Sequence, residues 1–114
     1  MHEFSVADEV IRLVKESAKE EGVQRVNSVS MAVGAMSCLH PPALETAFSA
    51  LTDGDDMFAG ASLEVILNPV VIACADCGEL SEIDAYAFIC PGCGSVDVEI
   101  VSGEEILINA YDGE

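Results

Sequence analysis

The 114-residue sequence has no tryptophan and only four phenylalanines and two tyrosines, so that aromatic residues make up 5% of the chain. Apolar residues of all kinds nevertheless make up 51%. A chain of this length and composition can fold as one modest domain, or as one domain with a small metal-held module inserted into it. The hydrophobic core must therefore be mostly aliphatic, and it does not need disulfide bonds.

Positive charge is scarce, because 4 Lys and Arg residues stand against 21 Asp and Glu residues, for a formal net charge of −17. A surface of this kind repels the phosphates of nucleic acids and of anionic membranes. We therefore expect neither nucleic acid nor membrane as a partner, and favour a divalent cation or a basic protein surface. A solvated acidic surface, as salt-adapted proteins carry, is the alternative explanation for most of these charges.

Long apolar stretches and a secretory signal are also missing. No stretch approaches the roughly 20 apolar residues that a membrane span needs. The opening residues Met1-His2-Glu3-Phe4 lack the basic region that leads into the apolar part of a signal peptide. Together with cysteine pairs of the zinc-binding type, these absences predict a reducing, cytoplasmic location.

Four of the five cysteines form two Cys-x-x-Cys pairs, Cys74 with Cys77 and Cys90 with Cys93. Such pairs, separated here by residues 78–89, predict a tetrahedral Zn(II) site with four thiolate ligands. A glycine follows each pair, and glycine accepts the positive φ of a tight turn. The zinc would be structural, because four protein ligands leave no open position for catalysis. The site therefore predicts a zinc ribbon and not an enzyme.

The rest of the chain predicts an α+β domain. Apolar residues at helical spacing predict one helix over 4–21, with a buried stripe of Phe4, Ala7, Val10, Ile11, Val14 and Ala18. They predict a second helix that opens at Pro41-Pro42 and buries Leu44, Ala47, Phe48 and Leu51. Alternating patterns predict strands over 25–34 and 61–68, the latter with Leu63, Val65 and Leu67 on one face, and a last strand within 104–111.

The simplest architecture is two helices packed on a three-stranded sheet, with the four-cysteine zinc ribbon inserted between the second and third strands. We place the α+β domain at residues 1–68 plus 104–114 and the inserted ribbon at residues 69–103.

The first residues offer a second and different set of metal ligands. The amine of Met1, the amide nitrogen of His2 and the imidazole of His2 can form adjoining chelate rings around one ion. This set suits a square-planar ion, Ni(II) or Cu(II), better than Zn(II), and it leaves a fourth position for another ligand. A surface histidine without a metal is the alternative that the residues alone leave open.

In their order and spacing these features resemble the HypA/HybF family of hydrogenase-maturation nickel chaperones. The resemblance covers essentially the whole chain, and the Met-His-Glu start combined with an internal four-cysteine ribbon is specific. The residues that carry it are Met1-His2-Glu3-Phe4-Ser5, the strand ending in Gly34, Ser37-x-x-x-Pro41, Ala47-Phe48, Cys90-Pro91-x-Cys93-Gly94-Ser95 and Gly103-Glu104-Glu105-Ile106.

The resemblance implies a nickel-binding domain built from both ends of the chain, with a zinc domain inserted. It implies that Ni(II), as transient cargo, binds the Met1 amine and His2, with Glu3 contributing through its backbone or side chain. It further implies delivery of nickel to the large subunit of NiFe hydrogenase, with the GTPase HypB as working partner. Some members of the family serve urease as well.

Two positions depart from the family pattern. An acidic residue commonly follows the glycine that ends the first strand, where this chain has Ala35, and some members carry an acidic residue before Pro41, where this chain has His40. We hypothesise that His40 supplies or exchanges with the fourth nickel ligand; the alternative is an exposed loop histidine. Cys38 is expected to be a small buried residue and not a ligand, since free cysteine is often buried.

Three other functions fit parts of the sequence. A redox or transferase enzyme could use a Cys-x-x-Cys dithiol, but zinc would occupy all four cysteines of the ribbon. A nucleic-acid-binding zinc ribbon is disfavoured by the charge of −17. An acidic zinc-ribbon adaptor that docks a basic partner and binds no nickel is the main alternative, and the nickel stoichiometry of the untagged protein would separate it from a nickel chaperone.

Overall fold

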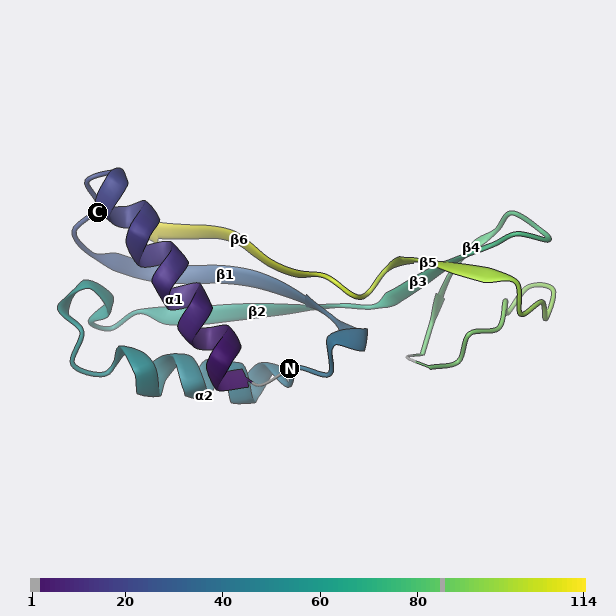
Figure 1. Cartoon of the computed structure of the whole chain (residues 1–114), viewed down its shortest axis with the longest axis horizontal. Helices are drawn as coiled ribbons and strands as arrows, with labels where there is room; N and C mark the ends of the chain where they lie inside the picture. The colour runs from purple at the N-terminus through teal and green to yellow at the C-terminus, as the bar shows by residue number, and fades with distance from the viewer. Residues whose placement is uncertain (1–2, 85) are drawn as a thin grey trace. The chain divides into compact units, whose positions relative to one another are not determined.

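The computed structural model describes residues 3–84 and 86–114 (Figure 1). In chain order the elements are α1 (Glu3–Glu20), β1 (Val26–Gly34), the 3-10 helix η1 (Ala35–Ser37), α2 (Pro41–Thr52), the 3-10 helix η2 (Asp56–Phe58), β2 (Ser62–Asn68), β3 (Val70–Cys74), β4 (Leu80–Ile83), β5 (Val98–Ser102) and β6 (Ile106–Gly113). The α+β class and the two helices are as the sequence predicts. Within the described residues, no helix is both long and apolar enough to cross a membrane.

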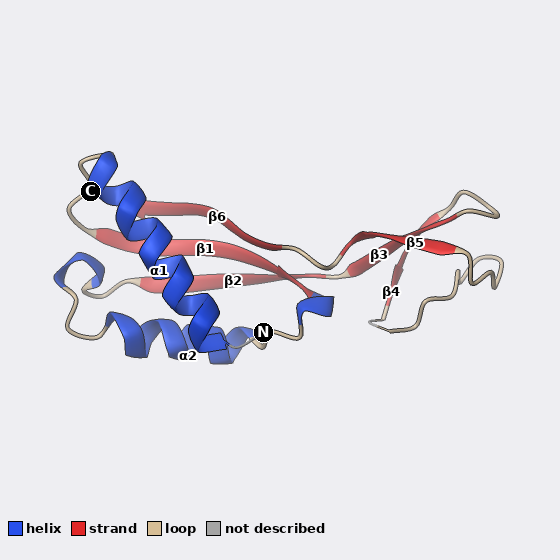
Figure 2. Ribbon diagram, viewed as in Figure 1, coloured by secondary structure: helices blue, strands red, loops and turns tan. Residues whose placement is uncertain are grey.

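The strands form two three-stranded sheets (Figure 2). The first has the order β2-β1-β6, and the second has the order β4-β3-β5. The first sheet is the one that the sequence predicts from the strands at both ends of the chain. The second belongs to the segment that the sequence assigns to the zinc ribbon.

The chain divides into two compact units. One, here called the helical unit, comprises Met1–Ala32, Leu39–Ile66 and Leu107–Glu114, and the other, the cysteine unit, comprises Val33–Cys38 and Leu67–Ile106. The domain boundaries given above from the sequence stay a prediction.

Aliphatic side chains dominate the core of the helical unit, where α1 packs against α2. Two of the few aromatic residues lie among them, because Phe48 and Phe58 are buried and meet edge to face with ring centroids 6.0 Å apart. The stripe of α1 that is buried consists of Val6, Ala7, Val10, Ile11, Val14 and Ala18.

Two apolar residues predicted to be buried on the helices are exposed, since Phe4 is 49% exposed and Leu51 is 40% exposed. Leu67, predicted to lie on the same strand face as the buried Leu63, is 53% exposed. On α2 the buried row continues from Phe48 to Thr52, whose hydroxyl donates to the Phe48 carbonyl at 2.8 Å. Leu44, Phe48 and Thr52, at intervals of four residues, form the buried row of α2. Leu51 lies four residues after the buried Ala47, and helical spacing alone therefore does not account for its exposure.

In the cysteine unit the second sheet buries one face. The central strand β3 is antiparallel to both β4 and β5, and Ile72 lies opposite Ser81 on one side and Ile100 on the other. Along β3 the residues Val70, Ile72 and Cys74 are buried, whereas Val71 and Ala73 between them are partly exposed. The buried face of the strand therefore ends at the first cysteine of the first pair.

Two backbone segments of the cysteine unit pass each other too closely for a side chain. A Cβ atom added to Gly34 would lie 2.0 Å from the carbonyl oxygen of Gly103. The same carbonyl accepts a hydrogen bond from the N–H of Met36 at 2.9 Å. Next to it, the Glu105 carboxylate accepts from the N–H of Gly103 at 2.7 Å and from the Asn68 side chain at 3.1 Å, which together fix this crossing.

Candidate metal centre

The two Cys-x-x-Cys pairs lie in turns of the same construction. The N–H of Gly78 donates to the carbonyl of Cys74 at 2.9 Å, and the N–H of Gly94 donates to that of Cys90 at 2.8 Å. The φ angles of these glycines are 74° and 76°, a conformation that a residue with a Cβ atom adopts only at a steric cost. The glycines that follow the pairs thus have the role that the sequence predicts.

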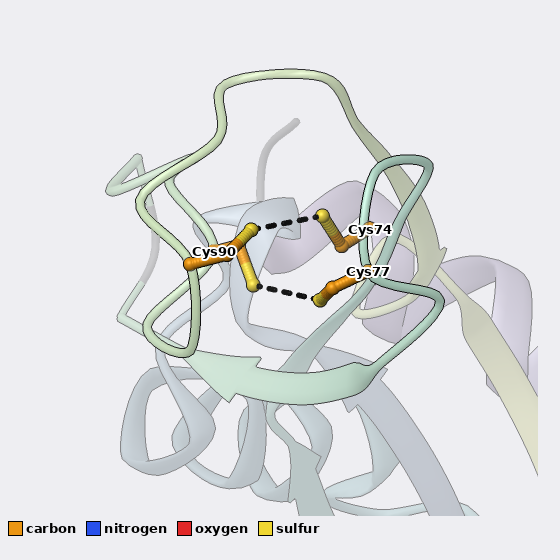
Figure 3. A group of neighbouring side chains, drawn as sticks. Cys74, Cys77 and Cys90 are labelled. Carbon is orange, nitrogen blue, oxygen red and sulfur yellow. Dashed lines mark hydrogen bonds between the residues drawn. The ribbon is translucent and has the colours of Figure 1, made fainter.

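The sulfurs of the two turns converge (Figure 3). The Sγ atoms of Cys74 and Cys93 are 3.6 Å apart, those of Cys77 and Cys90 are 3.7 Å apart, and all four lie within 4.8 Å of one another. Four sulfurs at the usual Zn–S distance of about 2.3 Å define a tetrahedron with edges of about 3.8 Å. The observed separations therefore fit a tetrahedral Zn(II) ion.

Backbone amides and neighbouring thiols set the ionisation of this group. The N–H of Cys77 and, against the opposing effect of burial, that of Asp76 lower the pKa of Cys74 to about 7. The N–H of Ser95 lowers the pKa of Cys93, but the neighbouring thiols, Cys74 first, outweigh it and raise this pKa to about 12. The negative charge of one ionised sulfur thus makes ionisation of the neighbouring thiols less favourable. A divalent cation bound between the sulfurs would favour the thiolate form of all four. The donor set is suited to a metal that binds thiolates.

Two of the residues predicted as nickel ligands, Glu3 and His40, belong to the helical unit. Met1 and His2 lie outside the described residues. Glu3 begins α1, and its Oε2 accepts a hydrogen bond from the backbone N–H of His40 at 3.2 Å. His40 is exposed and lies directly before α2. Two of the predicted residues, 37 positions apart in the chain, are thereby brought together.

The prediction that Cys38 is buried is wrong. Cys38 is exposed, its backbone is left-handed with φ 61°, and its Sγ lies 2.9 Å from the hydroxyl of Tyr86. This conformation ends the 3-10 helix η1, and the next residue, Leu39, is buried instead. Cys38 is not part of the four-cysteine group. Nothing in the local sequence pattern points to its contact with Tyr86, because the two residues are 48 positions apart.

The fold and this site define a class of protein, a small α+β protein in which one compact unit holds four cysteines at metal-binding distance. A family model described as "Hydrogenase/urease nickel incorporation, metallochaperone, hypA" matches residues 1–112. The chain belongs to the HypA family of nickel metallochaperones.

Known relatives and solved structures resemble the chain over nearly its full length. A hydrogenase maturation factor HypA from Moorella thermoacetica is 38% identical over 114 residues, which cover 100% of both chains. The one from Aquifex aeolicus is 32% identical over 100% of this chain and 98% of its own. The solution structure of the Ni metallochaperone HypA from Helicobacter pylori is 25% identical, covers 99% of this chain and 97% of its own, and superimposes with a TM-score of 0.68.

Proposed function

We propose that this protein binds Ni(II) at its N-terminus and delivers it for the maturation of NiFe hydrogenase, while Zn(II) in the four-cysteine site has a structural role. The observation that carries the proposal is the match to the HypA family over residues 1–112. Two sulfur separations of 3.6 and 3.7 Å, close to the tetrahedral edge of about 3.8 Å, support the zinc site. In this proposal the chain carries metal and catalyses no reaction itself.

The nickel ligands in this proposal are the amine of Met1 and the amide and imidazole nitrogens of His2, with Glu3 contributing. Nitrogen donors of this kind favour the square-planar geometry of Ni(II). Only a few ligands come from the protein, so that exchange to a recipient stays feasible. The contact between the Glu3 carboxylate and the backbone of His40 supports His40 as the residue that supplies or exchanges with the fourth ligand.

The working partners in this proposal are the GTPase HypB and the large subunit of NiFe hydrogenase, in the cytoplasm. The family description names urease beside hydrogenase, and urease maturation proteins are therefore the second class of recipient. A charge of −17 favours basic protein surfaces over nucleic acid as partners.

Nickel and zinc stoichiometry of the untagged protein tests the proposal. We expect one tight Ni(II) site in the natural protein, and loss of that site both in His2→Ala and in a variant with residues added before Met1, because the added peptide bond converts the amine to an amide. Zinc content should stay the same in both variants. Equal nickel affinity of the extended and natural proteins would refute the terminal site.

His40→Ala tests the fourth ligand separately. We expect the absorption spectrum of bound Ni(II) to change and its affinity to fall less than in His2→Ala. An unchanged spectrum and affinity would leave His40 an exposed histidine without a role in nickel binding. If the natural protein binds no nickel and retains zinc, the acidic adaptor is the better interpretation.

A further inference from the structure

Two side chains outside the cysteine set connect the two metal-binding turns. Asp76 lies inside the first turn, between Cys74 and Cys77, and Ser95 directly follows the second turn. The hydroxyl of Ser95 donates a hydrogen bond to Oδ2 of Asp76. The same hydroxyl accepts one from the N–H of Asp97 at 3.1 Å. As a donor, the Ser95 hydroxyl thus connects to the first cysteine turn. As an acceptor, it connects to the segment that follows the second turn.

A backbone hydrogen bond crosses at the same place. The N–H of Ala75 donates to the carbonyl of Asp97 at 2.9 Å. The first turn is therefore attached to the segment after the second turn by one backbone and one side-chain bond. Each turn carries two of the four sulfurs, and these two bonds, together with the pairing of Cys74 with Val98 in the sheet, connect the two halves of the cysteine group.

The negative charge of Asp76 is unfavourable at its position beside the cysteines, so that a compensating interaction is expected there. Four thiolates around one Zn(II) carry a net charge of about −2, and a nearby carboxylate is repelled by it. Electrostatics alone would therefore disfavour an acidic residue between Cys74 and Cys77. A hydrogen bond from a hydroxyl to a carboxylate is stronger than one to a neutral acceptor, and this offsets the repulsion.

We propose that the Asp76–Ser95 hydrogen bond is a clasp that holds the two cysteine turns at metal-binding separation and slows the loss of zinc. Asp76 and Ser95 are positioning residues, since they act through the four cysteines and do not bind the metal. The inference rests on the zinc site of the proposed function and is independent of nickel.

The rate of zinc transfer to an excess of a chromogenic chelator tests the clasp on the full-length protein. Loss of an outer-shell partner typically lowers metal affinity by about 10–100-fold. We expect Asp76→Ala and Ser95→Ala each to release zinc about tenfold faster, and the double variant to release it no faster than the singles, because all three lack the same bond.

Conservative and matched variants separate the hydrogen bond from the charge. Asp76→Asn keeps an oxygen acceptor for the Ser95 hydroxyl, and Ser95→Thr keeps the hydroxyl, so that both should release zinc at close to the natural rate. Asp97→Ala is the control, because it removes a neighbouring carboxylate and leaves the backbone groups of Asp97 in place. It should not speed the release.

The spectrum of Co(II) bound in place of zinc provides a readout that distinguishes positioning from unfolding. We expect every variant to show the absorption of a tetrahedral four-thiolate site, with only the exchange rate changed. The clasp is refuted if Asp76→Asn loses zinc as fast as Asp76→Ala, if Asp97→Ala does so too, or if the Ala variants lose the tetrahedral spectrum. A natural protein that holds no zinc would refute both the clasp and the zinc site, whereas a failure of nickel binding would leave the clasp intact.

Discussion

The two units of this protein differ in what can hold them together. The helical unit has two α-helices, a core built around Phe48 and Phe58, and every Lys and Arg residue of the chain. The cysteine unit has no Lys, Arg or His, and two of its fully or nearly fully buried side chains are the cysteines Cys74 and Cys90. Its acidic residues are Asp76, Glu79, Glu82, Asp84, Asp97, Glu99, Glu104 and Glu105.

This difference explains why a bound metal would stabilise the cysteine unit, whereas the helical unit does not need one. In the helical unit, burial of aliphatic and aromatic side chains can supply the free energy of folding. In the cysteine unit, the buried face is small, and the side chains that can carry charge, the carboxylates and the ionised cysteines, are all negative. A divalent cation bound there would both join the two turns and supply the positive charge that the side chains of this unit lack.

The largest expected effect is loss of the cysteine unit when its metal site is broken. Cys90→Ala removes a ligand whose side chain is only 1% exposed. We expect zinc to be lost and the amide resonances of β3, β4 and β5 to collapse toward random-coil positions, because folding of such modules is coupled to metal binding. Circular dichroism should still show the helical signal of α1 and α2. If Cys90→Ala unfolded the helical unit as well, the conclusion that the two units have separate sources of stability would be wrong.

The converse experiment removes the aromatic centre of the helical unit. Phe48→Ala deletes a fully buried ring that contacts Phe58 edge to face. A substitution of this kind destabilises a core by about 3–5 kcal/mol. Urea unfolding followed by circular dichroism should show that loss, and zinc content should remain one per chain. A variant that folds normally but has lost zinc would mean that the two units do not have separate sources of stability.

A smaller effect is expected where the backbone of the cysteine unit crosses itself. In Gly34→Ala the new Cβ would meet the carbonyl oxygen of Gly103 at 2.0 Å, and neither backbone can yield cheaply. Overpacking of this kind costs about 1–3 kcal/mol.

Gly22→Ala is the matched control for this crossing. Nothing lies within 4 Å of the added atom, and only the positive φ of 73° opposes the substitution. We expect about 1 kcal/mol there. Equal losses in thermal unfolding of the two variants would show that the crossing can accommodate a Cβ atom at position 34.

The comparison also shows what the sequence can and cannot predict. The first helix and the four-cysteine group follow from periodicity and spacing, because both depend on residues close together in the chain. The exposure of Leu51 and Cys38 does not follow from spacing. Leu51 has the same helical spacing as its buried neighbours on α2, and Cys38 is exposed where a left-handed residue ends η1. The hydrogen bond between Ser95 and Asp76 likewise cannot be predicted from the spacing of the residues. The cysteine pattern brings the two turns together but does not determine which polar side chains of the turns form a hydrogen bond.

The smallest expected effect concerns an ion pair at the edge of the helical core. Lys15 donates to Asp55, and this hydrogen bond, as the largest cause, lowers the pKa of Asp55 below its ordinary value of 3.8. A carboxylate with a lowered pKa in the folded state stabilises the fold above pH 3.8, and that contribution disappears as the pH falls through the lowered value. Because both side chains are partly exposed, solvent screening limits it to less than about 1 kcal/mol.

Lys15→Met tests this contribution, because it keeps an unbranched apolar side chain and removes the charge. The substitution also removes the ammonium group that lies over the ring of Phe58, 5.8 Å from its centroid, but that contact does not depend on the ionisation of Asp55. Urea unfolding at pH 6 and at pH 2.5 should show a stability difference from the natural protein that is present at the higher pH and shrinks at the lower one. Arg12→Met is the control, since Arg12 pairs with Glu9 and Glu16 on the exposed face of the same helix. A difference for Lys15→Met that is unchanged at pH 2.5 would assign the effect to the contact of the Lys15 ammonium group with the Phe58 ring and not to the ion pair.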